Sequence, residues 1–199
     1  MATRLLSARL VLRPPRPADV PELRRVMRRN QEHLRPWIPS AAPGTDPTSL
    51  TELAKMVLRA RRDWRNGTAF MFLVWKPGER PAPATIIGRI GLTQVVRGPL
   101  QSAYLGYWID VDHQRKGITT EAVDTVLAFA FDAVGLHRVG AGIMPRNTAS
   151  VRVVEKVGMR MEGLSERLLE IAGRWEDHMQ FAITSEEWEA RVAVPVSVT

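Results

Sequence analysis

The dipeptide Asn66-Gly67 separates two kinds of hydrophobic pattern in the first half of the chain. Before it, apolar residues recur every three or four positions, which predicts an amphipathic helix over residues 47–66. After it come three β-rich runs, at residues 68–75, 84–95 and 102–111, which are separated by turn residues. Elements with one apolar face bury it only by packing in layers, so the pattern predicts an α/β protein.

The other segments continue this alternation. Asp19 is expected to cap a helix in which Val20, Leu23, Val26 and Met27 repeat at helical spacing. Thr119 or Thr120 is expected to cap another helix, which ends at Gly135. Asn147 is expected to cap a short helix later in the chain. Further strands are predicted at residues 8–13, 137–143, 162–171 and 174–184. The elements predict one mixed, mostly antiparallel sheet of about seven strands, flanked by about four helices.

The composition is that of one globular domain. Of 199 residues, 45% are hydrophobic and 25% are charged, and there is no cysteine, which excludes disulfides and a catalytic thiol. The four histidines lack metal-ligand spacing, so no metal site is expected. No segment has the apolar length of a signal peptide or membrane span, so a cytoplasmic protein is expected. Residues 1–190 are assigned to the domain and residues 191–199 to a C-terminal tail.

The excess positive charge lies in the first third of the chain. Residues 1–65 carry 14 Arg and Lys against 6 Asp and Glu, whereas residues 66–199 carry 14 against 15. A basic surface favours anionic partners such as phosphates, nucleic acid or a ribonucleoprotein. The simpler interpretation is a solvated helix face, formed by Arg24, Arg25, Arg28 and Arg29. No aromatic residues interleave these arginines, so sequence-specific nucleic-acid binding is not expected.

The segment from Trp108 to Glu121 joins a strand to a helix through a basic turn. The first N–H groups of a helix lack internal partners, and the helix dipole makes this end positive. Gly117 lets the backbone approach a ligand closely, and Arg115 and Lys116 add charge, so the turn suits a pyrophosphate. It is neither a Walker loop nor a dinucleotide fingerprint. Taken alone, it is also an ordinary connection between a strand and a helix.

Several motifs accompany this turn, which itself reads Gln114-x-x-Gly117-x-Thr119. The others are Asn30-Gln-Glu-His-Leu-Arg-Pro-Trp37, Tyr104-Leu-Gly-Tyr-Trp-Ile109, Asn147-x-x-Ser150, Val157-Gly-Met, Glu162-Gly163 and Gly173-Arg-Trp-Glu-Asp-His178. Together they resemble the GNAT superfamily of N-acetyltransferases, and within it the RimJ/RimL branch of ribosomal-protein-alanine N-acetyltransferases. The acetyl-CoA signature of the superfamily is Gln/Arg-x-x-Gly-x-Gly/Ala, from which Thr119 departs. The resemblance covers about residues 7–190.

The resemblance implies a single-domain GNAT fold in which acetyl-CoA lies where the fourth and fifth strands splay apart. Pantetheine would pair with the backbone of residues 108–111, the pyrophosphate would rest on the N–H groups of residues 115–120, and strand N–H groups near Val111 would stabilise the oxyanion. Asn147 and Ser150 would hold the thiol end, although they also stand at the N-cap and N3 positions of a helix. The residues so implicated are Trp108, Ile109, Val111, Gln114, Arg115, Lys116, Gly117, Ile118, Thr119, Thr120, Asn147 and Ser150.

The resemblance also implies direct attack of a neutral amine on the thioester, without an acyl-enzyme. An α-amine, with a pKa of about 7.7–8.0, needs less assistance than a lysine at about 10.4. Because the helix after Asn147 contains no tyrosine, Ser150 is the candidate proton donor to the leaving thiolate. Glu166, or else Glu170, is the candidate base. Acceptor contacts are expected from Glu32, His33, Trp37 and Tyr104, although Trp37 could equally be a core residue.

Three functions follow from these features. The first is acetylation of a protein N-terminal α-amine, with the basic first third assisting approach to ribosomal particles. The second is acetylation of a small amine, such as an antibiotic, a polyamine or an amino-acid derivative. The third is a non-catalytic acyl-CoA-binding module. A homodimer is also expected from the resemblance, with the valine-rich tail (Val192, Val194, Val196 and Val198) as a possible contact.

Overall fold

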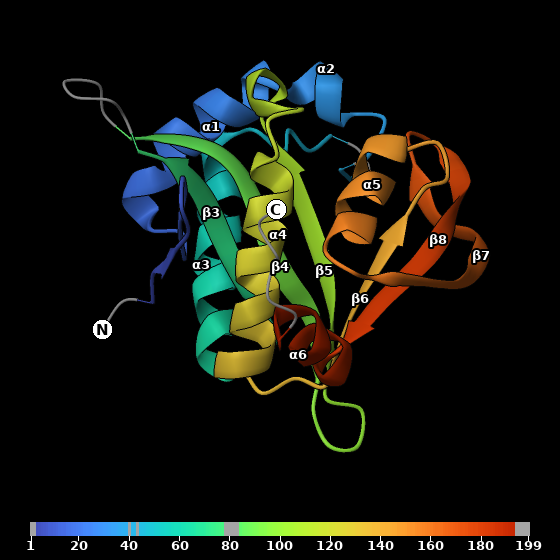
Figure 1. Ribbon diagram of the computed structural model, residues 1–199. Coiled ribbons are helices and arrows are strands. Elements are labelled where there is room, and N and C mark those ends of the chain that lie inside the picture. Colours follow the sequence, from blue (N-terminus) through green and yellow to red (C-terminus); the bar gives the residue numbers. More distant parts are fainter. Residues whose placement is uncertain (1–2, 40, 43, 78–83, 194–199) are drawn as a thin grey trace.

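A computed structural model describes residues 3–39, 41–42, 44–77 and 84–193 of the chain (Figure 1). All strands belong to one eight-stranded sheet of order β1-β2-β3-β4-β5-β6-β8-β7. The strands are β1 (Leu5–Leu6), β2 (Val11–Arg13), β3 (Phe70–Lys76), β4 (Thr85–Val96), β5 (Ser102–Ile109), β6 (Arg138–Ile143), β7 (Arg160–Ile171) and β8 (Arg174–Thr184). The α-helices are α1 (Val20–Arg29), α2 (Gln31–Leu34), α3 (Leu50–Asn66), α4 (Ile118–Ala128), α5 (Thr148–Lys156) and α6 (Ser185–Ala193).

The sheet splays between β5 and β6, its one parallel pair among the described strands. These strands are paired only at Ser102↔Arg138, Ala103↔Val139 and Tyr104↔Gly140. Figure 1 shows them diverging from their paired end near α6. The splay predicted between the fourth and fifth strands is therefore confirmed. The fourth and fifth predicted strands are β5 and β6, because the structure adds a short strand, Leu5–Leu6, that was not predicted. Beyond Tyr104, none of the described strands pairs with the β6-facing edge of β5.

Helices cover both faces of the sheet. On β3, Leu73 packs with α1 and α3, whereas its neighbours Phe72 and Val74 belong to the larger core that includes α4 and α5. This alternation is that of a strand buried on both faces. Within α3, the predicted apolar stripe is confirmed at Leu53, Val57 and Ala60, which are buried, and at the partly buried Trp64, but not at Leu50, which is 49% exposed. Ser49 and Gly67 cap the two ends of this helix.

Asp19 occupies the N-cap position of α1, as predicted, but its carboxylate makes no cap bond to that helix. It accepts hydrogen bonds from the Arg13 guanidinium and the Arg16 N–H instead, each at 2.7 Å. The predicted threonine cap of α4 was wrong. The cap of α4 is Gly117 rather than either threonine, because its left-handed φ of 73° lets the helix begin at Ile118. The α-helix ends at Ala128, and a single π-helical turn, Phe129–Ala133, continues it.

The end of the chain differs from the predicted tail. Helix α6 was not predicted, and the assigned boundary between residues 190 and 191 falls inside it. The contact predicted for Val194, Val196 and Val198 lies outside the described residues. Within the described ranges, no helix has the length and apolarity needed to cross a membrane.

Candidate functional site

The turn after β5 exposes the start of α4. The chain passes from the buried Asp110 through a short 3₁₀ turn, Val111–His113, and reaches α4 with Arg115 at φ 57° and Gly117 at φ 73°. Arg115, Lys116 and Gly117 are exposed, and no side chain caps the helix. The first N–H groups of α4 and two cations therefore lie at one exposed turn, an arrangement that suits an anionic group.

The loop between β1 and β2 holds this turn in place. The Arg9 guanidinium donates to the carbonyl of Lys116 at 2.9 Å and to the carboxylate of Glu121 at 2.7 Å. Glu121 also accepts from the Ser7 hydroxyl at 2.7 Å and the Arg9 N–H at 2.8 Å. Burial acts to raise the pKa of Glu121, but these hydrogen bonds and the Arg9 charge outweigh it and lower the pKa. Sequence spacing did not reveal this support, because Arg9 and Glu121 are far apart in the chain.

The end of α1 holds the start of the same turn. The Val111 N–H donates to the side-chain oxygen of the buried Asn30 at 2.8 Å, and the buried Asp110 is ion-paired with Arg29. The Val111 N–H is therefore engaged by Asn30 in this structure, so the oxyanion role predicted for strand N–H groups near Val111 would fall to other N–H groups of this segment. Arg29 pairs with the buried Asp110 although its own side chain is 39% exposed. Trp108 and Ile109 have buried side chains, so only their backbone could meet a ligand.

The structure brings Ser150 together with Tyr107, which sequence reasoning did not select. The Tyr107 hydroxyl lies 2.8 Å from the Ser150 hydroxyl and 3.3 Å from the Ser150 carbonyl oxygen. Burial raises the pKa of Tyr107 to about 12, although its bond to Ser150 acts in the opposite direction. Asn147 accepts the Ser150 N–H at 3.2 Å, so the predicted cap is confirmed. The pair joins β5 to α5 along the part of β5 that β6 leaves unpaired.

Two residues, Gln114 and Arg146, tie the segment between α1 and α3, which includes α2, to the rest of the site. The Gln114 amide lies 2.7 Å from the Nε2 atom of His33, next to the basic turn. The Arg146 guanidinium lies over the Trp37 ring at 4.9 Å, donates to the Pro36 carbonyl at 3.0 Å and pairs with Glu176. Trp37 is half-buried by this contact, so it is neither a core residue nor fully exposed.

Three further predicted residues lie apart from these contacts. Glu32 is exposed on α2. Tyr104 is 44% exposed and lines a hollow of about 220 Å³ with Arg138 and Glu162. Glu166 is exposed at an irregularity of β7, just beyond Ser165. Ser165 pairs with His178 of β8, and β8 separates β7 from β6, so Glu166 lies on the outermost strand of the sheet, two strands beyond β6. Among the described residues, no hydrogen bond or ion pair joins Glu166 to Ser150.

Comparison with known proteins decides the family. Residues 9–160 match the acetyltransferase (GNAT) domain. The chain belongs to the GNAT family of N-acetyltransferases. The RimJ/RimL resemblance is likewise confirmed, since the chain is 31% identical to the [ribosomal protein uS5]-alanine N-acetyltransferase of Escherichia coli, over 93% of this chain and 92% of that enzyme.

One solved structure and one further sequence relative are also similar to this chain. Mycobacterium smegmatis RimJ, solved in complex with CoA-disulfide, superposes with a TM-score of 0.83 at 34% identity, over 94% of this chain and 88% of that one. A Bacillus subtilis protein named as a probable N-acetyltransferase, YjcK, is 47% identical over 104 residues, which are 52% of this chain and 58% of that protein. Among the described residues of this GNAT enzyme, no group of three His, Asp or Glu side chains is placed to hold a metal ion.

Proposed function

We propose that this enzyme transfers the acetyl group of acetyl-CoA to the N-terminal α-amine of a protein. The observation that carries the proposal is the splay between β5 and β6 with the exposed start of α4 beside it. The Mycobacterium smegmatis RimJ structure, which holds CoA, supports it. The relative that acetylates an alanine of ribosomal protein uS5 supports a protein acceptor.

The residues at the turn fit a CoA molecule. The N–H groups of residues 115–120, with Arg115 and Lys116, would hold the pyrophosphate, because residues 115–117 are exposed and α4 lacks a side-chain cap. A methyl group added at Gly117 would meet only the end of Arg9, at 3.5 Å, so the turn has open space in front of it. The unpaired edge of β5 near Trp108 and Ile109 would pair with pantetheine.

Acetyl-CoA supplies a thioester that a neutral amine attacks directly, which releases a thiolate. Ser150 would donate a hydrogen bond to this sulfur. Burial keeps Tyr107 protonated near neutral pH, and either of the two hydroxyls could be the donor in their contact. In the reacting arrangement the Tyr107 hydroxyl would donate to the Ser150 hydroxyl oxygen, which would leave the serine proton for the sulfur. Tyr107 is thus a positioning residue for Ser150.

The acceptor would approach along the open edge of the splay. An α-amine is substantially neutral near pH 8, so it needs only a weak base, and the exposed carboxylate of Glu166 would accept its proton through water. Glu32, His33 and Trp37 would border the acceptor, because the loop that carries them contacts both Gln114 and Arg146. The basic first third would assist approach to a ribosomal particle.

The test is CoA release from the purified full chain with three classes of acceptor. These are peptides with a free N-terminus, matched peptides with a blocked N-terminus and an internal lysine, and small amines such as a polyamine. We expect release with free N-termini and none with the blocked peptides. Release with lysine side chains or small amines alone would refute the protein N-terminus as acceptor. CoA binding without release for any acceptor would identify a non-catalytic binding module.

A further inference from the structure

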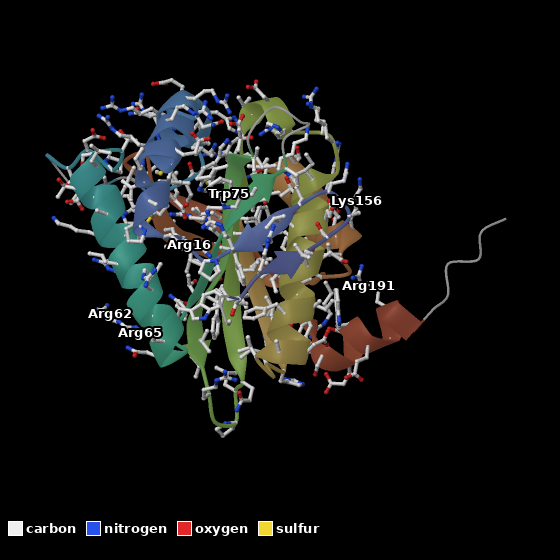
Figure 2. The ribbon with its side chains drawn as sticks, turned by 90° about the vertical axis from the view of Figure 1, so that its left-hand side faces the viewer. Arg16, Arg62, Arg65, Trp75, Lys156 and Arg191 are labelled. Carbon is white, nitrogen blue, oxygen red and sulfur yellow. The ribbon has the colours of Figure 1, made fainter. Side chains whose placement is uncertain are left out.

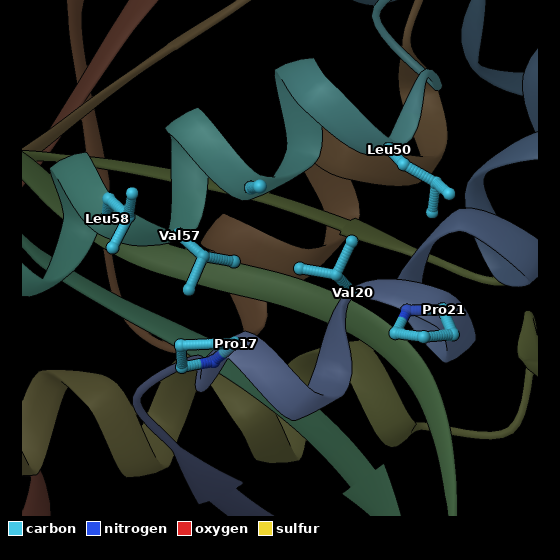
Figure 3. Close-up of a pocket in the computed structure, with 7 residues that line it drawn as sticks. Pro17, Val20, Pro21, Leu50, Val57 and Leu58 are labelled. Atoms are coloured by element: carbon cyan, nitrogen blue, oxygen red, sulfur yellow. The ribbon is translucent and has the colours of Figure 1, made fainter.

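An apolar groove runs between the start of α1 and the middle of α3 (Figure 3). It has a volume of about 350 Å³, and its lining is aliphatic or proline throughout. We call it the α1–α3 groove; its lining residues include Pro17, Val20, Pro21, Leu50, Val57 and Leu58. None of these residues belongs to the site described above. Leu50 is 49% exposed and Leu58 is 60% exposed, so apolar surface here stays in contact with water.

Arginines border this groove. Positions 54, 58, 61 and 65 share one face of a helix, so the groove-lining face of α3 continues into Arg61 and Arg65. Arg16 directly precedes Pro17 at the other wall. All three are exposed, and within the described residues none has a carboxylate at ion-pair distance. Figure 2 shows Arg65 and the adjacent Arg62 projecting from α3, and Arg16 from the segment before α1.

The carboxylates near the groove are already paired. Glu52 pairs with Lys55 and Glu22 with Arg25, each at 2.7 Å. Asp19 is buried against Arg13, also at 2.7 Å. The arginines Arg25 and Arg28 of α1, which carried the predicted basic face, are likewise paired, Arg28 with Asp46 at 3.7 Å. Among the residues that the structure describes, Arg16, Arg61 and Arg65 are therefore part of the uncompensated positive charge of this region, together with Arg24 and Arg59.

We propose that the α1–α3 groove docks an acidic segment of a partner polypeptide. Apolar side chains of the segment would occupy the groove, and its carboxylates would pair with Arg16, Arg61 and Arg65. This assignment rests on the groove and its border alone and does not depend on the identity of the acetyl acceptor.

The lining favours a polypeptide over RNA or a second copy of the chain. Single-stranded nucleic acid binds through stacking on aromatic side chains together with backbone charge, and the groove offers no aromatic or polar side chain. Two copies that met groove to groove about a two-fold axis would bring like-charged arginine borders together. An acidic segment with apolar residues satisfies both the groove and its border.

The test measures binding of a fluorescein-labelled peptide with leucines at helical spacing among glutamates, by anisotropy. Two control peptides replace the glutamates by lysine or the leucines by serine. We expect the full chain to bind the first peptide at least about tenfold more tightly than either control. Leu58→Glu should weaken binding about tenfold or more, because it places a charge in the apolar groove. The double variant Arg61→Glu/Arg65→Glu should have an effect of the same size, because it reverses the charge that pairs with the glutamates of the peptide.

Arg174→Glu is the matched control, since Arg174 is exposed on β8, far along the sheet from α3. It should leave peptide binding unchanged, and CoA binding should confirm that every variant is folded. Equal affinity for all three peptides, or no effect of the groove variants, would overturn the proposal. So would RNA binding that needs the arginines but not Leu58, or self-association of the chain that Leu58→Glu abolishes.

Discussion

The side-chain oxygen of Asn30 accepts the N–H of Val111 at 2.8 Å, which joins the end of α1 to the end of β5. The Asn30 amide also donates to the Val26 carbonyl at 2.9 Å, so this fully buried side chain is satisfied on both sides. The basic turn follows Val111 directly. The Asn30 side chain therefore fixes helix α1 to the turn proposed to bind CoA. Helix α1 also leads to the segment proposed to border the acceptor.

Asn30→Ala should destabilise the protein by about 2 kcal/mol, because it removes both hydrogen bonds of a buried amide. Urea unfolding monitored by tryptophan fluorescence measures this loss. Asn66→Ala is the matched control, since Asn66 is exposed at the end of α3, and it should cost less than about 0.5 kcal/mol. Equal losses for the two variants would show that the Asn30 bonds contribute nothing specific.

Gly117→Ala should weaken CoA binding by about tenfold and destabilise the fold by about 1 kcal/mol. Its φ of 73° disfavours any residue with a Cβ, and relaxation of that angle would turn the first N–H groups of α4 away from the ligand. Isothermal titration with CoA gives the affinity. Gly98→Ala provides the comparison, because Gly98 has a φ of 71° and open space around it in the turn after β4. It should show the same loss of stability with unchanged CoA affinity.

The order of most elements could be predicted from the sequence, because hydrophobic period and turn residues report local structure. The splay was predicted only from the resemblance to the family. The side-chain pairs that complete the site could not be predicted. Tyr107 and Ser150 are 43 positions apart, and Asn30 and Val111 are 81 apart. No periodicity links such pairs; only the folded sheet brings them together. The threonines were wrongly predicted to cap α4 because residue preference alone ranks Thr with the N-cap residues, whereas backbone conformation selected Gly117.

Ser150→Ala should lower kcat by about 100-fold with little change in KM for acetyl-CoA, because it removes the donor to the leaving sulfur. Tyr107→Phe should lower kcat by about tenfold, since the serine proton is then no longer directed. If Tyr107 acts only through Ser150, the double variant should be no slower than Ser150→Ala. Steady-state kinetics with an N-terminal peptide measure all three. Additive losses would mean that Tyr107 acts independently of Ser150.

Glu121→Gln should destabilise the protein in a pH-dependent way. Burial alone would raise the pKa of Glu121, but the bonds from Ser7 and Arg9 lower it below its ordinary value of 4.5. A carboxylate whose folded pKa is lowered stabilises the protein fully above its ordinary pKa, and this stabilisation disappears as pH falls through the lowered value. The variant should therefore lose about 1–2 kcal/mol at pH 7, and its difference from the unmodified chain should shrink below about pH 4. Urea unfolding at pH 7, 5 and 3 measures the difference, with Glu170→Gln, an exposed residue of β7, as the control. A difference that is constant with pH would show that the Arg9–Glu121 contact does not hold the turn through the glutamate charge.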